Sequence, residues 1–270
     1  MLGTRAQYEP GTFSWIELAT TDVEGAKDFY GRLFGWQADD RVIPEEAGGG
    51  IYTMAMLDGD EVAGLGEQQA GQREAGVPPY WFSYITVANA DATATNAQEL
   101  GGTVHAGPFD VMESGRMAVM ADPTGAMFGI WQAGDSIGAT RVNDPGCLTS
   151  NELSTNDVAR AAEFYSQLFG WQVTEMDTRG GPRYWAIRHD GAAEGRNGGM
   201  RELGPQQAGV PPYWMPYFTV ADADATIASA NASNGVVRTG PMKIPTGARF
   251  AVLGDPQGAT FAIFEGEVDD

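Results

Sequence analysis

Two hydrophobic patterns alternate along the chain. Residues 13–20 form a short strand-like run, and the segment that follows has apolar residues at helical spacing on one face. Those helical positions are Ala26, Phe29, Tyr30, Leu33 and Phe34. Asp22 can accept the free N–H groups of the first helical turn, and Gly35 is typical of a helix end. The pattern therefore predicts a strand, an Asp-capped helix and a stop at Gly35.

Short strand-like runs follow this helix, bounded by Gly-rich or Asp-Gly turns. They lie at about 36–42, 51–57 and 61–66. The pattern then restarts with a strand at Tyr80–Val87 and a helix at Asp91–Leu100, closed by Gly101 and Gly102. Further strands are predicted around 103–110, 116–121 and 126–132. The first part of the chain therefore contains two βαβββ modules.

The rest of the chain repeats this pattern. Trp15–Asp22 aligns with Ser150–Asp157 at a shift of 135 residues, and Ala75–Trp81 aligns with Ala208–Trp214 at a shift of 133. A net deletion of two residues in an intervening loop explains the change of shift. We therefore expect two tandem domains, at residues 11–133 and 146–265, joined by a linker at residues 134–145.

The length and composition agree with two ordinary globular domains. A chain of 270 residues can bury two sizeable cores, and no stretch has the eighteen or so apolar residues of a membrane helix. The N-terminal residues lack the apolar region of a signal peptide, so we expect a cytoplasmic protein without membrane partners. Cys147 is the only cysteine, which excludes an intrachain disulfide and a cysteine-based metal cluster.

The charge argues against one class of partner. The formal net charge is -20, so the phosphates of a nucleic acid would meet a repulsive field. The same field would attract cationic small molecules, although a generally acidic, soluble proteome gives the same composition. We expect no nucleic-acid partner.

Several motifs now point to a family. Each copy has a strand leading to an Asp-capped helix with Phe-Tyr and then Leu-Phe-Gly-Trp, and a final hairpin with Asp-Pro-x-Gly before an apolar strand. This arrangement resembles the vicinal oxygen chelate superfamily, which includes glyoxalase I, extradiol dioxygenases and bleomycin-resistance proteins. The resemblance covers nearly the whole chain, twice. It implies an α+β fold in which paired modules curl a mixed sheet into a U-shaped trough with the functional site on its concave side.

The resemblance also implies where metal ligands would lie. In metal-dependent members, His or Glu side chains come from the first strand of each module, the last strand of the domain and the last strand of the first module. The first three of these positions fall here on Trp15, Phe82 and Gly129, and in the second copy on Ser150, Met215 and Ala262. The remaining ligand would lie in Val62–Leu65 or Asn197–Met200, which have no His or carboxylate at the aligned places.

These residue types are poor metal ligands, because a catalytic ion needs several converging N or O atoms. The only two histidines, His105 and His189, do not align with each other and receive no role. The sequence therefore predicts no metal site and no cofactor.

Strand alternation extends these positions into a concave face, since residues i and i+2 point the same way. In the first copy the face comprises Phe13, Trp15, Glu17, Tyr80, Phe82, Tyr84, Gly129 and Trp131. In the second copy it comprises Ser150, Glu152, Tyr213, Met215, Tyr217, Ala262 and Phe264. Aromatic walls suit flat ligands, and Gly129 or Ala262 would leave space open beside them. Alternation alone leaves a second interpretation, in which the aromatics fill the core between sheet and helices.

Glu17 and Glu152 occupy the same inward position in the two copies. A carboxylate there could bind a ligand amine or act as a general base. The alternative is a glutamate that is paired with a neighbouring arginine or lies at the interdomain seam.

These features predict a metal-independent small-molecule-binding protein of the glyoxalase and bleomycin-resistance type. Its ligand would be an aromatic or polycyclic metabolite or antibiotic, cationic or neutral, bound for resistance, sequestration or biosynthesis. The alternatives are a glyoxalase-like lyase, isomerase or oxygenase ("hydroxylase"), whose catalytic residues the sequence does not identify, and a degenerate fold that acts through protein contacts. Either a monomer with a pseudo-two-fold pair of domains or a homodimer fits the repeat.

Overall fold

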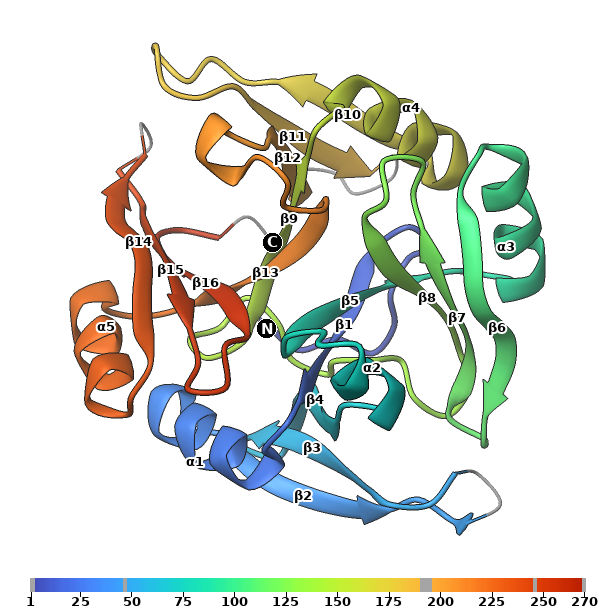
Figure 1. Cartoon of the computed structure of the whole chain (residues 1–270), viewed down its shortest axis with the longest axis horizontal. Helices are drawn as coiled ribbons and strands as arrows, with labels where there is room; N and C mark the ends of the chain where they lie inside the picture. The colour runs from blue at the N-terminus through green and yellow to red at the C-terminus, as the bar shows by residue number, and fades with distance from the viewer. Residues whose placement is uncertain (1–2, 46–47, 190–195, 245–246, 269–270) are drawn as a thin grey trace.

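The structure is a computed structural model that describes residues 3–45, 48–189, 196–244 and 247–268 (Figure 1). In the first half, one module comprises β1 (Phe13–Thr20), α1 (Val23–Phe34), β2 (Gln37–Val42), β3 (Ile51–Leu57) and β4 (Asp60–Glu67). The next comprises β5 (Tyr80–Thr86), α3 (Ala90–Glu99), β6 (Thr103–Val111), β7 (Gly115–Ala121) and β8 (Met127–Ala133). A short helix, α2 (Ala70–Glu74), connects the two modules.

The second half repeats the order. Its first module comprises β9 (Leu148–Thr155), α4 (Val158–Phe169), β10 (Trp171–Glu175), β11 (Tyr184–His189) and β12 (Arg196–Glu202). Its second comprises β13 (Tyr213–Thr219), α5 (Ala223–Ala232), β14 (Val236–Lys243), β15 (Arg249–Gly254) and β16 (Thr260–Glu265). The predicted α+β class and the βαβββ modules are confirmed. The short helix α2 and the 3-10 turn η2 (Pro205–Gln207) were not predicted from the pattern.

The first helix shows why the local sequence folds this way. The Asp22 side chain accepts a hydrogen bond from the backbone N–H of Gly25, as expected for an N-cap. Gly35 ends the helix with φ of 76°, a left-handed conformation that glycine adopts without steric cost. Asp157 and Gly170 do the same for α4. Both helix boundaries therefore follow from single residues that the sequence places correctly.

The sheet is mixed, as predicted. In the first half, β1 pairs in parallel with β4 and antiparallel with β5, and β5 pairs in parallel with β8. The equivalent strands of the second half run in the order β12, β9, β13 and β16. One parallel residue pair, Met127 with Tyr213, connects the two halves into a single sheet.

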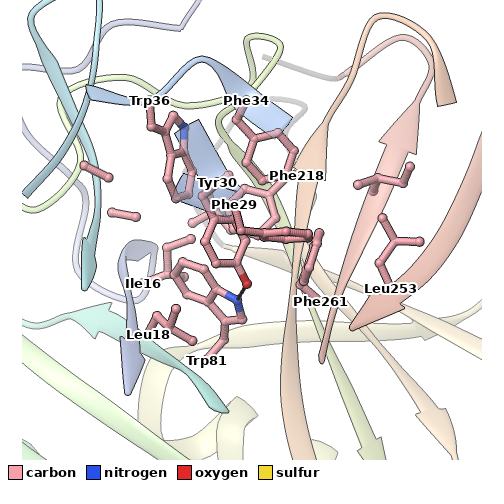
Figure 2. Close-up of a cluster of buried hydrophobic side chains, with 14 of the residues drawn as sticks. Ile16, Leu18, Phe29, Tyr30, Phe34, Trp36, Trp81, Phe218, Leu253 and Phe261 are labelled. Carbon is pink, nitrogen blue, oxygen red and sulfur yellow. Dashed lines mark hydrogen bonds between the residues drawn. The ribbon is translucent and has the colours of Figure 1, made fainter. Parts of the chain in front are cut away.

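The four longer helices lie around the outside of the molecule in two pairs that cross the halves. Figure 1 shows α1 beside α5 and α3 beside α4. One buried cluster combines Phe29 and Tyr30 of α1 with Phe218 of β13 and Phe261 of β16 (Figure 2). A second cluster combines β5, α3, β7 and β8 with α4 and its neighbours. Each half therefore completes its core with helices and strands of the other.

These shared cores identify the two faces of each strand. Ile16, Leu18, Trp81 and Ile85 point into the clusters beneath the helices, and Phe128 and Ile130 of β8 do the same. The residues between them point to the opposite face. We call this opposite face of β1, β4, β5 and β8 the first trough, and the matching face of β9, β12, β13 and β16 the second trough. Among the described residues, no helix is long and apolar enough to cross a membrane.

Candidate ligand-binding site

Phe13 does not belong to the first trough, contrary to prediction. The register of β1 against β5 shifts between Phe13 and Trp15, so simple alternation fails at this point. The Phe13 ring packs instead against Trp171 and Trp214, with ring centroids 5.5 Å and 4.9 Å away. Phe13 is therefore part of the core between the halves, and the trough begins at Trp15.

Trp15 and Glu17 lie on the trough face and are joined by a tyrosine from β3. The Trp15 indole N–H donates to the Tyr52 hydroxyl at 3.1 Å, and that hydroxyl donates to Glu17 Oε2 at 2.9 Å. The Tyr52 ring lies directly over Gly64 of β4, where a Cβ atom would overlap the hydroxyl. The absence of a side chain at Gly64 therefore lets Tyr52 reach Glu17.

Phe82 and Tyr84 form the neighbouring wall. Phe82 lies opposite Glu17 and Tyr84 opposite Trp15 in the antiparallel register of β1 and β5. The two rings meet edge to face with centroids 5.1 Å apart. A Cβ atom at Gly129 would overlap both rings, so the expectation that Gly129 leaves open space is wrong. The aromatic rings themselves occupy that space, which makes the wall continuous.

Tyr80 and Trp131 extend the trough face on either side. The Gln72 side chain of α2 donates to the Tyr80 hydroxyl at 2.8 Å, so the short helix that the sequence did not predict contributes to this face. The half-buried Trp131 lies further along β8 and donates from its indole N–H to the Ser136 carbonyl at 2.9 Å. Within the described residues, Trp131 makes no ring contact with Phe82 or Tyr84. The structure therefore brings Trp15, Glu17, Phe82 and Tyr84 together and places Trp131 beside them.

Glu17 is the charged group of this face. Burial raises its pKa, and the hydrogen bond from Tyr52 acts in the opposite direction. Burial, followed by the nearby Glu17 charge, raises the pKa of both Tyr52 and Tyr84 well above the usual value. Across the described part of the chain, Glu17 has no ion pair with a Lys, Arg or His. Glu17 is thus a half-buried carboxylate that accepts a hydrogen bond from a neutral phenol.

In the second trough the equivalent carboxylate, Glu152, has a cationic partner. Glu152 is 7% exposed and accepts a hydrogen bond from Arg201 Nε at 2.9 Å. Arg201 also donates to the Gln207 side chain at 3.2 Å, and Gln207 donates to the Tyr213 hydroxyl at 3.3 Å. Burial raises the pKa of Glu152, while the Arg201 charge lowers it. The expected alternative of a glutamate paired with an arginine is therefore correct for Glu152.

The apolar residues of the second trough pack closely on one another. Met215, Tyr217 and Ala262 form a buried cluster, and Phe250 and Phe264 pack against it. Ala262 is fully buried, so it leaves no open space either. Ser150, which lies opposite Tyr217, takes the place of Trp15. The second trough therefore has the predicted residues but smaller aromatic walls.

Sequence reasoning missed Tyr52 and Arg201, although a signal for each existed. Tyr184 lies over Gly199 in the second half as Tyr52 lies over Gly64, so the tyrosine and glycine recur in equivalent hairpins. Aligning these hairpins would have exposed both the shared tyrosine and the arginine found in the second copy alone.

The residues of the troughs do not fit a His and Glu metal centre. The positions implied for metal ligands hold Trp15, Phe82 and Gly129 in the first trough, and none offers a ligating N or O atom of the usual kind. In the described ranges, no three His, Cys, Asp or Glu side chains come together. His105 is exposed on β6, and His189 ends β11 beside Gly11.

Comparison with known proteins agrees with this architecture. The model of the Glyoxalase/Bleomycin resistance protein/Dioxygenase superfamily matches residues 12–130 and again residues 148–263. The chain belongs to this superfamily. It is 43% identical to "Putative glyoxylase CFP32" of Mycobacterium tuberculosis, covering 97% of each chain. It is 35% identical to "Anthracycline biosynthesis protein DauV" of Streptomyces sp., covering 96% of this chain and 94% of the relative.

Two solved structures share the fold at low sequence identity. The Mn(II)-bound glyoxalase from Novosphingobium aromaticivorans is 13% identical with a TM-score of 0.64, over 96% of this chain and 84% of that one. The 2,3-dioxygenase LapB from Pseudomonas sp. KL28 is 13% identical with a TM-score of 0.63, over 98% of this chain and 93% of that one. At this identity the likeness concerns the fold alone, and the ligand must be inferred from the troughs themselves.

Proposed function

We propose that this chain is a metal-independent protein that binds a flat aromatic small molecule in the first trough, with Glu17 as its polar anchor. One observation carries the proposal: a carboxylate without a cationic partner in the described structure lies beside Trp15, Tyr52 and Tyr84. A buried or half-buried carboxylate is costly unless it is paired or used. A ligand that brings a cationic group would supply the missing partner.

The two parts of the site suit the two parts of such a ligand. Aromatic walls such as Trp15 and Phe82 stack on flat ring systems and add about 0.5–1.5 kcal/mol per contact beyond area burial. A charge-assisted hydrogen bond to the Glu17 carboxylate contributes about 1.5–3 kcal/mol. The net charge of -20 would also raise the local concentration of a cationic ligand.

The relatives support an aromatic polycyclic ligand. DauV is named for anthracycline biosynthesis, and the anthracycline ring system is planar and polycyclic. A resistance, sequestration or biosynthetic accessory role is consistent with this relationship and with a trough that lacks the usual metal ligands.

Calorimetric titration with two probes tests the proposal. The probes are a naphthylmethyl trimethylammonium cation, which carries a fixed charge, and neutral naphthylmethanol. We expect Trp15→Ala to weaken both probes and Glu17→Gln to weaken the cation tenfold or more, one decade per 1.4 kcal/mol. Glu99→Gln removes an exposed carboxylate on α3 and serves as the matched charge control. Absence of binding by wild type, or unchanged affinity in Trp15→Ala, would overturn the proposal.

A second candidate is a glyoxalase-like lyase, isomerase or oxygenase. The relative named as a glyoxylase supports it, and so does the raised pKa of Glu17 beside the Tyr52 hydroxyl, since general bases work best with a pKa near the operating pH. Elemental analysis separates the two functions. Stoichiometric Zn, Ni, Mn or Fe that supports turnover would favour the enzyme and contradict metal-independent binding.

A further inference from the structure

We infer that one equivalent position, Gly66 in the first trough and Arg201 in the second, determines which trough accepts a cationic ligand. The first trough would bind a cationic ligand through Glu17. In the second trough, the Arg201 guanidinium already pairs with Glu152 and would prevent a cationic ligand from binding there. The inference rests on the proposed function of the first trough and names the residue that sets its selectivity.

Strand register establishes that the two positions are equivalent. Glu17 lies opposite Gly64 in the parallel pair of β1 and β4, and Glu152 lies opposite Gly199 in the pair of β9 and β12. Two residues further on, Gly66 lies opposite Ala19 and Arg201 opposite Ser154. Because residues two apart share a face, both positions adjoin the carboxylate of their own trough.

Arg201 occupies the place that a ligand cation would take in the second trough. Its Nε lies 2.9 Å from Glu152 Oε1, and Gln207 accepts from another guanidinium nitrogen at 3.2 Å. The Arg201 side chain is 30% exposed and that of Glu152 is 9% exposed, so the arginine lies between the carboxylate and solvent. A second cation would meet like charge there and gain little from a carboxylate that is already neutralised.

In the first trough the position equivalent to Arg201 is Gly66, which has no side chain. A Cβ atom at Gly66 would have the Tyr52 ring as its nearest neighbour at 3.8 Å, an ordinary van der Waals contact. Gly66 is not among the glycines with positive φ, so a larger residue fits its backbone. Gln72 donates to the Tyr80 hydroxyl as Gln207 donates to that of Tyr213, but Gly66 offers it no guanidinium group to hold. The glycine therefore leaves Glu17 available to a cation from outside.

Exchanging the two residues tests the inference. Gly66→Arg copies Arg201 into the first trough, and Gly66→Met is the uncharged variant of similar length. Both are titrated with the naphthylmethyl trimethylammonium cation and with neutral naphthylmethanol. We expect Gly66→Met to change both affinities in parallel, and Gly66→Arg to weaken the cation at least tenfold more than the neutral probe.

Arg201→Gly is the reciprocal variant. We expect it to raise the number of bound cations per chain from one to two, while the double variant Gly66→Arg/Arg201→Gly returns to one. In the double variant, cation binding should no longer change the tryptophan fluorescence that arises from Trp15 and Trp131. The cation then binds in the second trough, which has Ser150 and Phe264 at those places. Circular dichroism establishes that each variant is folded.

The outcomes separate this inference from the proposed function. If wild type binds neither probe, the proposed function fails. If wild type binds the cation through Glu17 but Gly66→Arg and Gly66→Met change the ratio of the two affinities equally, the inference is overturned while the function stands. A folded Arg201→Gly that still binds one cation also overturns it. If Arg201→Gly does not fold, the comparison of Gly66→Arg with Gly66→Met decides.

Discussion

The Tyr30 hydroxyl of the first half donates a buried hydrogen bond to the Asp255 carboxylate of the second half, at 3.0 Å. Asp255 also accepts from the backbone N–H groups of its own Asp-Pro-Gln-Gly turn, including that of Ala259 at 2.8 Å. The Trp81 indole donates to the same Tyr30 oxygen, as Figure 2 shows. Two motifs that are far apart in the sequence, Phe-Tyr and Asp-Pro-x-Gly, therefore meet across the halves.

Removing this hydroxyl should destabilise the whole molecule. Tyr30→Phe leaves Oδ2 of Asp255 and the Trp81 N–H without their buried partner, at a cost of about 1–3 kcal/mol. Tyr165→Phe is the matched variant, because Tyr165 accepts from Trp214 at 2.9 Å in the same way. Chemical denaturation measures the free energy of unfolding of both variants. Full stability in Tyr30→Phe would show that this hydrogen bond between the halves does not contribute to the free energy of unfolding.

Removing the ion pair of the second trough should cause a loss of stability that depends on pH. Arg201→Met leaves Glu152 buried without its cation, which costs about 3–5 kcal/mol for a fully buried pair and less here because Arg201 is partly exposed. Burial already raises the pKa of Glu152, so the folded state holds a proton more tightly than the unfolded state. Stability should therefore fall as pH rises above the ordinary glutamate range, and more steeply in Arg201→Met than in wild type.

Denaturation of Arg201→Met at acidic and at neutral pH checks this. Arg183→Met is the control, because Arg183 pairs with Glu175 on the surface and is 58% exposed. A loss of stability relative to wild type that is the same at both pH values would mean that Arg201 does not influence the pKa of Glu152 in the folded state.

Much of this fold follows from local residue patterns. The boundaries of α1 come from Asp22 and Gly35, and the same pair recurs in α4 as Asp157 and Gly170. The trough positions of Trp15 and Glu17 follow from alternation with Ile16 and Leu18, once the helices show which face is the core.

The remaining features depend on contacts between strands, which a single sequence does not specify. Phe13 was misplaced because a shift of register reverses its face, and the space at Gly129 was misjudged because neighbouring rings fill it. Arg201 was missed because its pairing with Glu152 depends on the register of β12 against β9. Aligning the two hairpins can find the arginine in the sequence, but its pairing with Glu152 appears only in three dimensions.

The pH dependence of binding provides a further prediction. A quaternary ammonium probe does not titrate, so its affinity follows the ionisation of Glu17. Because burial raises the pKa of Glu17 above its ordinary value of about 4.5, affinity should rise with pH through a midpoint above that value. Titration calorimetry across acidic to neutral pH measures the midpoint. Glu17→Gln should give a flat profile, and a pH-dependent profile in that variant would assign the titration to another group.

The last prediction concerns Gly64, over which Tyr52 reaches Glu17. Gly64 is not among the glycines with positive φ, so Gly64→Ala strains no backbone angle and acts through the overlap of its Cβ with the Tyr52 ring. Displacing Tyr52 removes a hydrogen bond that lowers the pKa of Glu17. We therefore expect the midpoint of cation binding to move to higher pH in Gly64→Ala.

Tyr52→Phe removes the hydroxyl but keeps the ring, and it should shift the midpoint of cation binding in the same direction. In a Tyr52→Phe background, Gly64→Ala should then add little further shift, since the hydrogen bond is already absent. The cycle of single and double variants is measured by the same pH-dependent titration. Additive shifts would mean that Gly64→Ala acts on Glu17 by a route other than Tyr52, and the hydrogen-bonded chain from Trp15 through Tyr52 would not control the charge of the trough.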